Sequence, residues 1–369
     1  MHDLVSGGKP LNGQVRPQCC HWLLSRNVAA GWDARRRGLE DARQTLPFPA
    51  SPTAVGAARI PRPGSGRLLA RHDVSGGAPG TRPNGAGARS CIAHAGASAL
   101  APAHTMAAYR RALELGADFV EPDLQLTRDG VLVCLHDLSL ERTTNVEKVY
   151  PERATEVVSA GSSARTWLVN DFTLEEIQRL DAGTWFDPAF AGARVPTLQE
   201  LIDLVAGKAG IYPETKDPEF YLGRGIDVDR KLHDLLVTNG LDTRQGQRAT
   251  PVLIQSFHES SLRTLRQLGG DQYDLVQLVW IDQWNDFLSD GGLEHVSEYA
   301  QAVSPFLTFA LGDPTLLGRA HERGLAVHAW QALEAFPPPG FDDEAAYIRH
   351  LLDDIGLDGL FVHDPELCP

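Results

Sequence analysis

From residue 91 onward, the chain alternates between short apolar runs and amphipathic stretches. The expected strands are 91–94, 118–124, 131–135, 210–214, 252–257, 275–280, 303–307, 326–330 and 359–362. Such alternation is typical of a parallel sheet whose strands are joined by helices. These candidates suit an eight-stranded barrel in which one candidate is either not a strand or belongs to an extra hairpin. Arg128-Asp129-Gly130, between the second and third candidates, is a hairpin-type turn. We therefore predict an α/β fold, a (β/α)8 TIM barrel.

The connecting segments also predict helices. Helices are expected over 105–115, with Thr105 as the N-cap, over 172–180 and over 197–206. The run 143–195 is too long for an ordinary barrel connection and has few strand signals. We expect this run to be a small insertion that caps the barrel mouth.

The first part of the chain differs in composition from the rest. Residues 1–88 are rich in Gly, Pro, Ala and Arg and lack a sustained apolar period, so we expect a disordered or non-native N-terminal extension before a barrel domain at 89–369. Residues 1–90 carry a net charge of +8 and residues 91–369 one of −22. An acidic folded part argues against a nucleic-acid partner. Because no run of about 18 apolar residues occurs, we expect no transmembrane segment.

The five cysteines have no C-x-x-C spacing, so the sequence indicates neither a zinc site nor a disulfide framework. Cys91 and Cys134 lie on expected neighbouring strands. We interpret both as small buried apolar residues rather than as a bridge.

Three acids and two histidines lie at the expected carboxyl ends of strands. Glu121 and Asp123 are two residues apart on one strand, so their side chains leave the same face, and Glu214 ends another strand. Three carboxylates at one barrel mouth repel each other unless a cation lies between them, and all-oxygen ligation favours Ca²⁺ or Mg²⁺. The alternative is a solvated acidic rim. His94 and His136 are candidates for a general acid and base, and the alternative is a structural role.

Several motifs in this region resemble the glycerophosphodiester phosphodiesterase family, and in particular its bacterial secreted branch. These motifs are His94 followed by Gly96, A-P-A-H-T at 101–105, Glu121-x-Asp123, Asp129-Gly130, His136-Asp137, Pro196-Thr197-Leu198, Glu214-x-Lys216, Gln255-Ser256-Phe257 and F-V-H-D-P-E at 361–366. Each motif is weak alone, but together they follow the family order over about residues 90–369. The chain departs from the family at Ala95, where an Arg is usual, and at Ala103, where an acid is usual.

The resemblance implies a metal-dependent hydrolase that cleaves glycerophosphodiesters to sn-glycerol 3-phosphate and an alcohol, within lipid and glycerol metabolism. It implies catalysis by His94 and His136, and a divalent cation held by Glu121, Asp123 and Glu214. Lys216 is expected to contact the phosphate, with a simple ion pair as its alternative. Trp330 is expected to line the substrate pocket, with a packed aromatic as its alternative.

The sequence is also compatible with two other functions. One is a catalytically impaired relative that binds phosphodiesters or a partner, which the residues at Ala95 and Ala103 favour. The other is a lyase-like phosphodiesterase that releases a cyclic phosphate. The resemblance suggests a secreted or periplasmic protein, although the first residues show no signal peptide. The alcohol head group, the preferred cation and the oligomeric state are not specified by the sequence.

Overall fold

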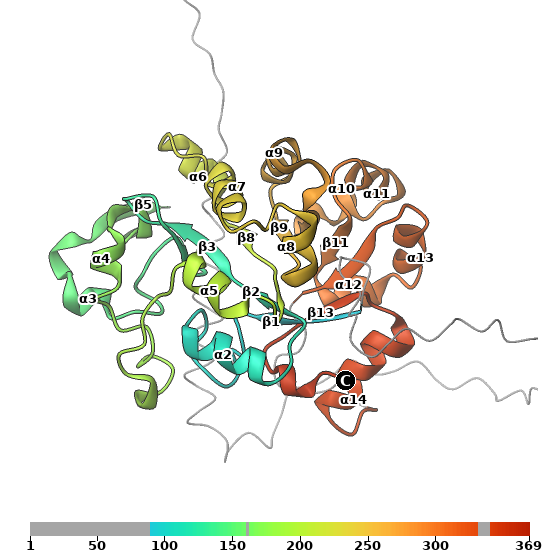
Figure 1. Cartoon of the computed structure of the whole chain (residues 1–369), viewed down its shortest axis with the longest axis horizontal. Coiled ribbons are helices and arrows are strands. Elements are labelled where there is room, and N and C mark those ends of the chain that lie inside the picture. Colours follow the sequence, from blue (N-terminus) through green and yellow to red (C-terminus); the bar gives the residue numbers. More distant parts are fainter. Residues whose placement is uncertain (1–88, 160–161, 331–339) are drawn as a thin grey trace, which may run out of the picture. The chain divides into compact units, whose positions relative to one another are not determined.

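The computed structural model describes residues 89–159, 162–330 and 340–369. The expectation of a disordered extension over 1–88 therefore lies outside the described residues. The described chain forms a sheet of short strands surrounded by helices (Figure 1). Among the described helices, none is both long and apolar enough to cross a membrane.

The sheet follows the predicted parallel order. The strands are β1 (Ser90–His94), β2 (Phe119–Glu121), β3 (Asp123–Leu126), β4 (Leu132–Cys134), β7 (Gly210–Ile211), β8 (Glu214–Thr215), β9 (Leu253–Ser256), β10 (Asp274–Val279), β11 (Ala302–Pro305), β12 (Ala326–Ala329) and β13 (Gly359–Val362). Strand β1 pairs with both β2 and β13, so the last strand lies beside the first. The predicted TIM barrel is confirmed.

Two of the expected strands are each divided by a proline. Pro122 separates β2 from β3, and Pro213 separates β7 from β8. Because proline has no N–H group to donate, the ladder is interrupted there. Strands β2 and β7 pair on one side of the break, and β3 and β8 on the other. The expected additional strand is β4, which pairs antiparallel with β3 across the turn at 128–130.

The helices lie outside the sheet, as Figure 1 shows. They are α2 (Met106–Glu114), α5 (Leu198–Val205), α6 (Pro218–Gly223), α7 (Val228–Thr238), α8 (Arg244–Ala249), α9 (Glu259–Gly269), α10 (Trp284–Phe287), α11 (Asp290–Ser297), α12 (Leu307–Gly312), α13 (Leu316–His321) and α14 (Glu344–Arg349). The hydroxyl of Thr105 accepts a hydrogen bond from the Ala108 amide and caps α2. Thr197 and Glu200 form a capping box at the start of α5. The expected boundaries of these two helices are confirmed within a few residues.

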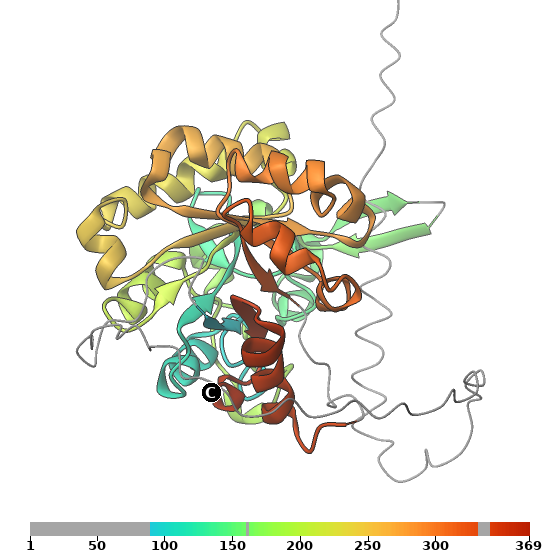
Figure 2. The same ribbon diagram turned by 90° about the vertical axis from the view of Figure 1, so that its right-hand side faces the viewer.

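The run 143–195 contains short helices and a β-hairpin. The helices are α3 (Val146–Val149) and α4 (Leu174–Ile177), and the hairpin pairs β5 (Thr155–Ser159) with β6 (Ser162–Thr166). The hairpin, which the sequence did not predict, projects from the barrel in Figure 2. The run shares a separate apolar core with Val133, Leu135 and Leu140. The insertion is therefore anchored on the β4 side of the barrel.

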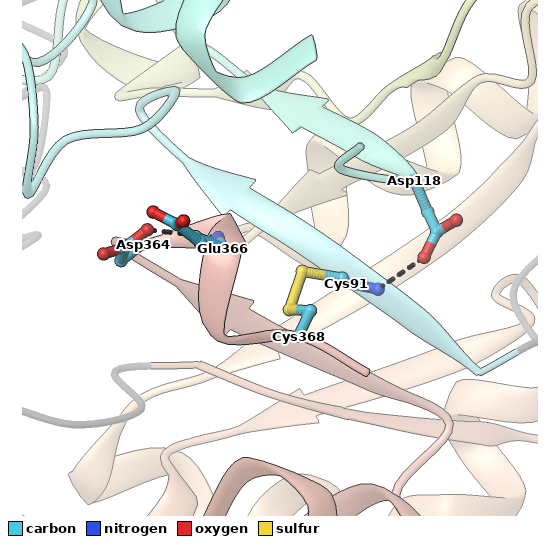
Figure 3. The surroundings of a disulfide bond; sticks show 5 residues. All are labelled: Cys91, Asp118, Asp364, Glu366 and Cys368. Atoms are coloured by element: carbon cyan, nitrogen blue, oxygen red, sulfur yellow. Dashed lines mark hydrogen bonds between the residues drawn. A yellow bond between two sulfur atoms is a disulfide. The ribbon is translucent and has the colours of Figure 1, made fainter. Parts of the chain in front are cut away.

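A disulfide joins the beginning of β1 to the end of the chain. Cys91 and Cys368 are bonded over a separation of 277 residues, with their Cα atoms 6.3 Å apart (Figure 3). The prediction of no disulfide is therefore wrong. The sequence could not show the bond, because the two residues become neighbours only when β13 pairs with β1. Cys134 is buried and free, as expected.

Candidate active site

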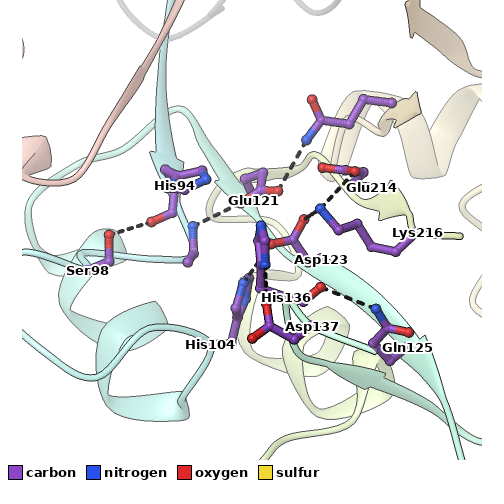
Figure 4. A network of polar contacts seen from close by, with 12 residues as sticks. His94, Ser98, His104, Glu121, Asp123, Gln125, His136, Asp137, Glu214 and Lys216 are labelled. Carbon is purple, nitrogen blue, oxygen red and sulfur yellow. Dashed lines mark hydrogen bonds and ion pairs between the residues drawn. The ribbon is translucent and has the colours of Figure 1, made fainter. Parts of the chain in front are cut away.

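The three expected acids meet beside the breaks at Pro122 and Pro213, where β2 ends and where β3 and β8 begin. Glu121 ends β2, Asp123 begins β3, and Glu214, the partner of Asp123 in the ladder, begins β8. All three are at most 6% exposed, and one ligand atom from each lies within 4.8 Å of the others. Figure 4 shows the side chains pointing toward one another. This group is compatible with a divalent metal ion, because hard cations prefer carboxylate oxygen.

Burial makes the negative charges of this group unfavourable. Burial, together with the nearby Asp123 carboxylate, raises the pKa values of Glu121 and Glu214 well above the usual value. Burial also acts to raise the pKa of Asp123, but Lys216 and two histidines outweigh it and keep that pKa well below the usual value. With Lys216 as the neighbouring cation, three ionised carboxylates leave two negative charges to be offset. A divalent cation would supply that charge.

Lys216 lies between two of the acids. Its ammonium nitrogen lies 3.0 Å from Oε1 of Glu214 and 3.4 Å from Oδ1 of Asp123. Burial acts to lower the pKa of Lys216, but these carboxylates outweigh it and raise the pKa above its usual value. The ion-pair alternative is therefore present in the structure. The phosphate role of Lys216 stays a prediction.

Two neighbouring groups hold the Glu121 carboxylate. The backbone N–H of Ala95 donates to Oε2 at 2.8 Å, and the Gln255 side-chain amide donates to Oε1 at 3.1 Å. Ala95 has a left-handed backbone with φ of 54°. It is followed by Gly96, also left-handed, where a Cβ atom would lie 2.7 Å from the backbone of Ala108. The turn after β1 thus needs glycine at this position, and it aims an amide at Glu121.

His136 follows β4 and has an acidic partner. Its Nδ1 atom lies 2.6 Å from Oδ1 of Asp137, and the Arg142 guanidinium donates to both oxygens of the same carboxylate. Burial acts to raise the pKa of Asp137, but His136 and Arg142 outweigh it and hold the pKa well below its usual value. The ionised carboxylate accepts only, so Nδ1 of His136 carries a proton. With this proton on Nδ1, Nε2 is the ring nitrogen that can accept a proton.

His94 ends β1, beside Glu121 in the strand ladder. Burial lowers the pKa of His94 well below the usual value, and the nearby imidazole of His363 lowers it further. His363 follows β13, and the two Nδ1 atoms are 3.4 Å apart. The sequence gave no role to His363, because this residue replaces the one that is usual in the family.

His104 is another residue to which the sequence gave no role. Its Nε2 atom lies 2.9 Å from Oδ2 of Asp123, and its Nδ1 atom lies 3.0 Å from the hydroxyl of Tyr109. Its φ of 55° is rare for a residue with a side chain. The available signal was its place in the A-P-A-H-T motif, directly before the N-cap Thr105. Local strain of this kind often accompanies functional sites.

Trp330 lies beyond the end of β12 and packs in an aromatic cluster. Its ring stacks on Trp280 at a centroid distance of 5.3 Å and meets Phe257 and Phe306 edge-on. Trp330 is therefore a packed aromatic residue, as the alternative interpretation expected. Contact with substrate stays a prediction. His328, on β12, is fully buried and lies 2.8 Å from the Tyr212 hydroxyl, consistent with a structural role.

The fold and this centre define a class of protein: an α/β-barrel enzyme with an acidic, cation-compatible site at the carboxyl ends of its strands. The Glycerophosphoryl diester phosphodiesterase family model matches residues 94–367, and the chain belongs to this family. The expected family is thus confirmed.

Individual relatives agree with this assignment. The chain is similar to the glycerophosphodiester phosphodiesterase of Bacillus subtilis (strain 168), with 34% identity over 75% of this chain and 84% of the relative. It is 38% identical to that of Caldanaerobacter subterraneus subsp. tengcongensis, over 74% of this chain and 94% of the relative. The crystal structure of the Agrobacterium tumefaciens glycerophosphodiester phosphodiesterase superposes with a TM-score of 0.56 and 25% identity, over 75% of this chain and 97% of that one. The expected enzyme class, a glycerophosphodiester phosphodiesterase, is confirmed.

Proposed function

We propose that this chain hydrolyses glycerophosphodiesters to sn-glycerol 3-phosphate and an alcohol, with His94 and His136 as the proton-transferring groups. The observation that carries the proposal is the convergence of His94, His136 and the buried carboxylates in one region of the barrel (Figure 4). A solved phosphodiesterase from Oleispira antarctica, described in complex with the product sn-glycerol-3-phosphate, shares the fold with a TM-score of 0.56 and 23% identity over 75% of this chain and 94% of that one.

We also propose that the buried acidic group binds a divalent cation. Glu121, Asp123 and Glu214 would hold Ca²⁺ or Mg²⁺, which when bound polarises a phosphoryl oxygen and offsets developing negative charge. The all-oxygen donor set disfavours zinc. Lys216 would pair with a phosphate oxygen next to this centre.

The hydrogen bonds favour His136 as the general base and His94 as the general acid. Asp137 holds the proton of His136 on Nδ1, so Nε2 is the atom able to take a proton from the attacking oxygen. His94 would deliver its Nε2 proton to the departing alcohol oxygen as the P–O bond breaks, and the proton that His136 has taken up would return to His94 through solvent. Trp330 and its aromatic neighbours would line the side of the pocket that receives the alcohol.

The segment 143–195 would act as a cap at the barrel mouth, and residues 1–88 would be dispensable for folding. The disulfide between Cys91 and Cys368 supports an oxidising compartment, where such bonds persist.

The test is release of glycerol 3-phosphate from glycerophosphocholine, measured in a coupled assay. We expect His94→Ala and His136→Ala each to lower kcat by about 10²–10⁴-fold. His321→Ala is the matched control, because His321 is similarly exposed and also pairs with an aspartate, Asp358, at 2.7 Å. Unchanged rates in both active-site variants would contradict the proposed roles.

A further inference from the structure

The ring of His363 lies against the ring of His94. Their centroids are 4.8 Å apart at an interplanar angle of 84°, and the Nδ1 atoms are separated by 3.4 Å. Strand pairing explains the contact, because Ala93 on β1 is the register partner of Val362 on β13. His94 is the residue after Ala93 at the end of β1, and His363 is the residue after Val362, directly following β13, so the two side chains lie together.

Ser98 ties the two histidines together. Its hydroxyl donates to the backbone carbonyl of His94 at 2.7 Å and lies 2.8 Å from Nδ1 of His363. The backbone N–H of Ala99 donates to the carbonyl of His363 at 3.0 Å. The turn after β1 is therefore fastened to the end of β13 through both a side chain and the backbone.

The hydroxyl has only one proton, and this decides where the protons of the rings lie. Since Ser98 donates to the His94 carbonyl, it must accept from His363, and Nδ1 of His363 carries a proton. That proton also faces Nδ1 of His94, which is then the accepting atom. The remaining proton of a neutral His94 ring lies on Nε2.

We propose that His363 and Ser98 are positioning residues that orient the His94 ring and keep its proton on Nε2. The proposal rests on the proposed role of His94 as the proton donor. His94 and His136 are then set by different partners. Asp137 leaves Nε2 of His136 able to accept a proton, and His363 leaves Nε2 of His94 able to donate one.

The first measurement is the kinetics of glycerol 3-phosphate release. We expect His363→Ala to lower kcat by about 10–100-fold with less than a threefold change in KM, because a displaced acid loses alignment without losing substrate contacts. His363→Asn places an amide N–H near the position of Nδ1, and we expect it to restore most of the lost rate. Ser98→Ala should give an intermediate loss. His321→Ala again serves as the control.

The second measurement reads the tautomer directly. In the full chain labelled with 15N-histidine, the imidazole nitrogen shifts of His94, assigned by their loss in His94→Gln, should report a protonated Nε2 and an unprotonated Nδ1. In His363→Ala they should shift toward a mixture of tautomers, with His363→Asn close to the parent. A parent ring protonated on Nδ1, or unchanged shifts and unchanged kcat in His363→Ala, would overturn the proposal.

These two readouts separate the proposal from the function on which it rests. If His94→Ala keeps full activity while the His94 tautomer still depends on His363, the catalytic role of His94 is wrong and the positioning contact stands. If His94→Ala is inactive while His363→Ala matches the parent in both measurements, the positioning proposal alone is wrong. If His363→Ala loses its folded structure, Ser98→Ala and His363→Asn decide by the same two readouts.

Discussion

The Nε2 atom of His104 lies 2.9 Å from Oδ2 of Asp123, and both side chains are almost fully buried. The pKa of Asp123 is held well below its usual value, so the carboxylate is ionised and His104 must be the donor. Nδ1 of the neutral His104 ring then accepts from the Tyr109 hydroxyl. This chain of hydrogen bonds fixes the orientation of one proposed metal ligand from behind.

We therefore predict that His104→Ala weakens cation binding by about 10–100-fold, the range for groups that orient metal ligands. Tyr109→Phe removes only the donor to Nδ1 and should have a smaller effect. Calorimetric titration of both variants with Ca²⁺ and Mg²⁺ measures this. Parent-like affinity in a folded His104→Ala protein would show that Asp123 needs no support.

Removing the charge of Lys216 should strengthen cation binding and slow the hydrolysis. Its ammonium shares Asp123 and Glu214 with the proposed cation. Removing this like charge in Lys216→Met should tighten cation binding by roughly tenfold at pH 8, because two positive charges this close repel each other. The same variant should lower kcat, since the phosphate loses a charged partner. Lys216→Arg keeps the charge and is the matched control. Weaker cation binding together with unchanged kcat would argue against both roles.

The departures at Ala95 and Ala103 can be tested by restoring the usual family residues. We expect Ala95→Arg with Ala103→Glu to raise the hydrolysis rate by about an order of magnitude, because a guanidinium beside the phosphate is a preorganised charge contact. Ala95→Arg alone should do less, since the arginine lacks an acid to orient it and lowers the pKa of the neighbouring histidine. Rates of the parent, both single variants and the double variant give the coupling. A double variant that binds the cation normally but is no faster than the parent would show that the missing arginine does not limit this site.

The bond between Cys91 and Cys368 closes a loop of 277 residues. A disulfide lowers the conformational entropy of the unfolded chain, and the stabilisation increases with the length of the closed loop. We therefore predict that Cys368→Ser lowers the free energy of unfolding by about 2–4 kcal/mol. Thermal unfolding with and without reductant measures the effect. Reductant should lower the melting temperature of the parent and leave that of Cys368→Ser unchanged. Equal melting temperatures for the parent and the variant without reductant would contradict the prediction.

The sequence predicted the barrel, most of its strands and the residues of the acidic group, because strand alternation and the motif spacings are local signals. It did not predict contacts that depend on barrel closure. Cys368 and His363 lie far along the chain from Cys91 and His94, and only the pairing of β13 with β1 brings them together. His104 was overlooked for another reason: its bond to Asp123 depends on a left-handed backbone that the sequence did not reveal.

The cation dependence of glycerol 3-phosphate release by the full chain tests the proposed metal-dependent hydrolysis. Glu121, Asp123 and Glu214 form a buried acidic group whose ligand atoms lie within 4.8 Å of one another. We predict that chelator abolishes the release and that Ca²⁺ or Mg²⁺ restores it, whereas Asp123→Asn stays slow at the same cation concentrations. Full activity in chelator, or a cation response unchanged by Asp123→Asn, would contradict a catalytic role for a cation held by these acids.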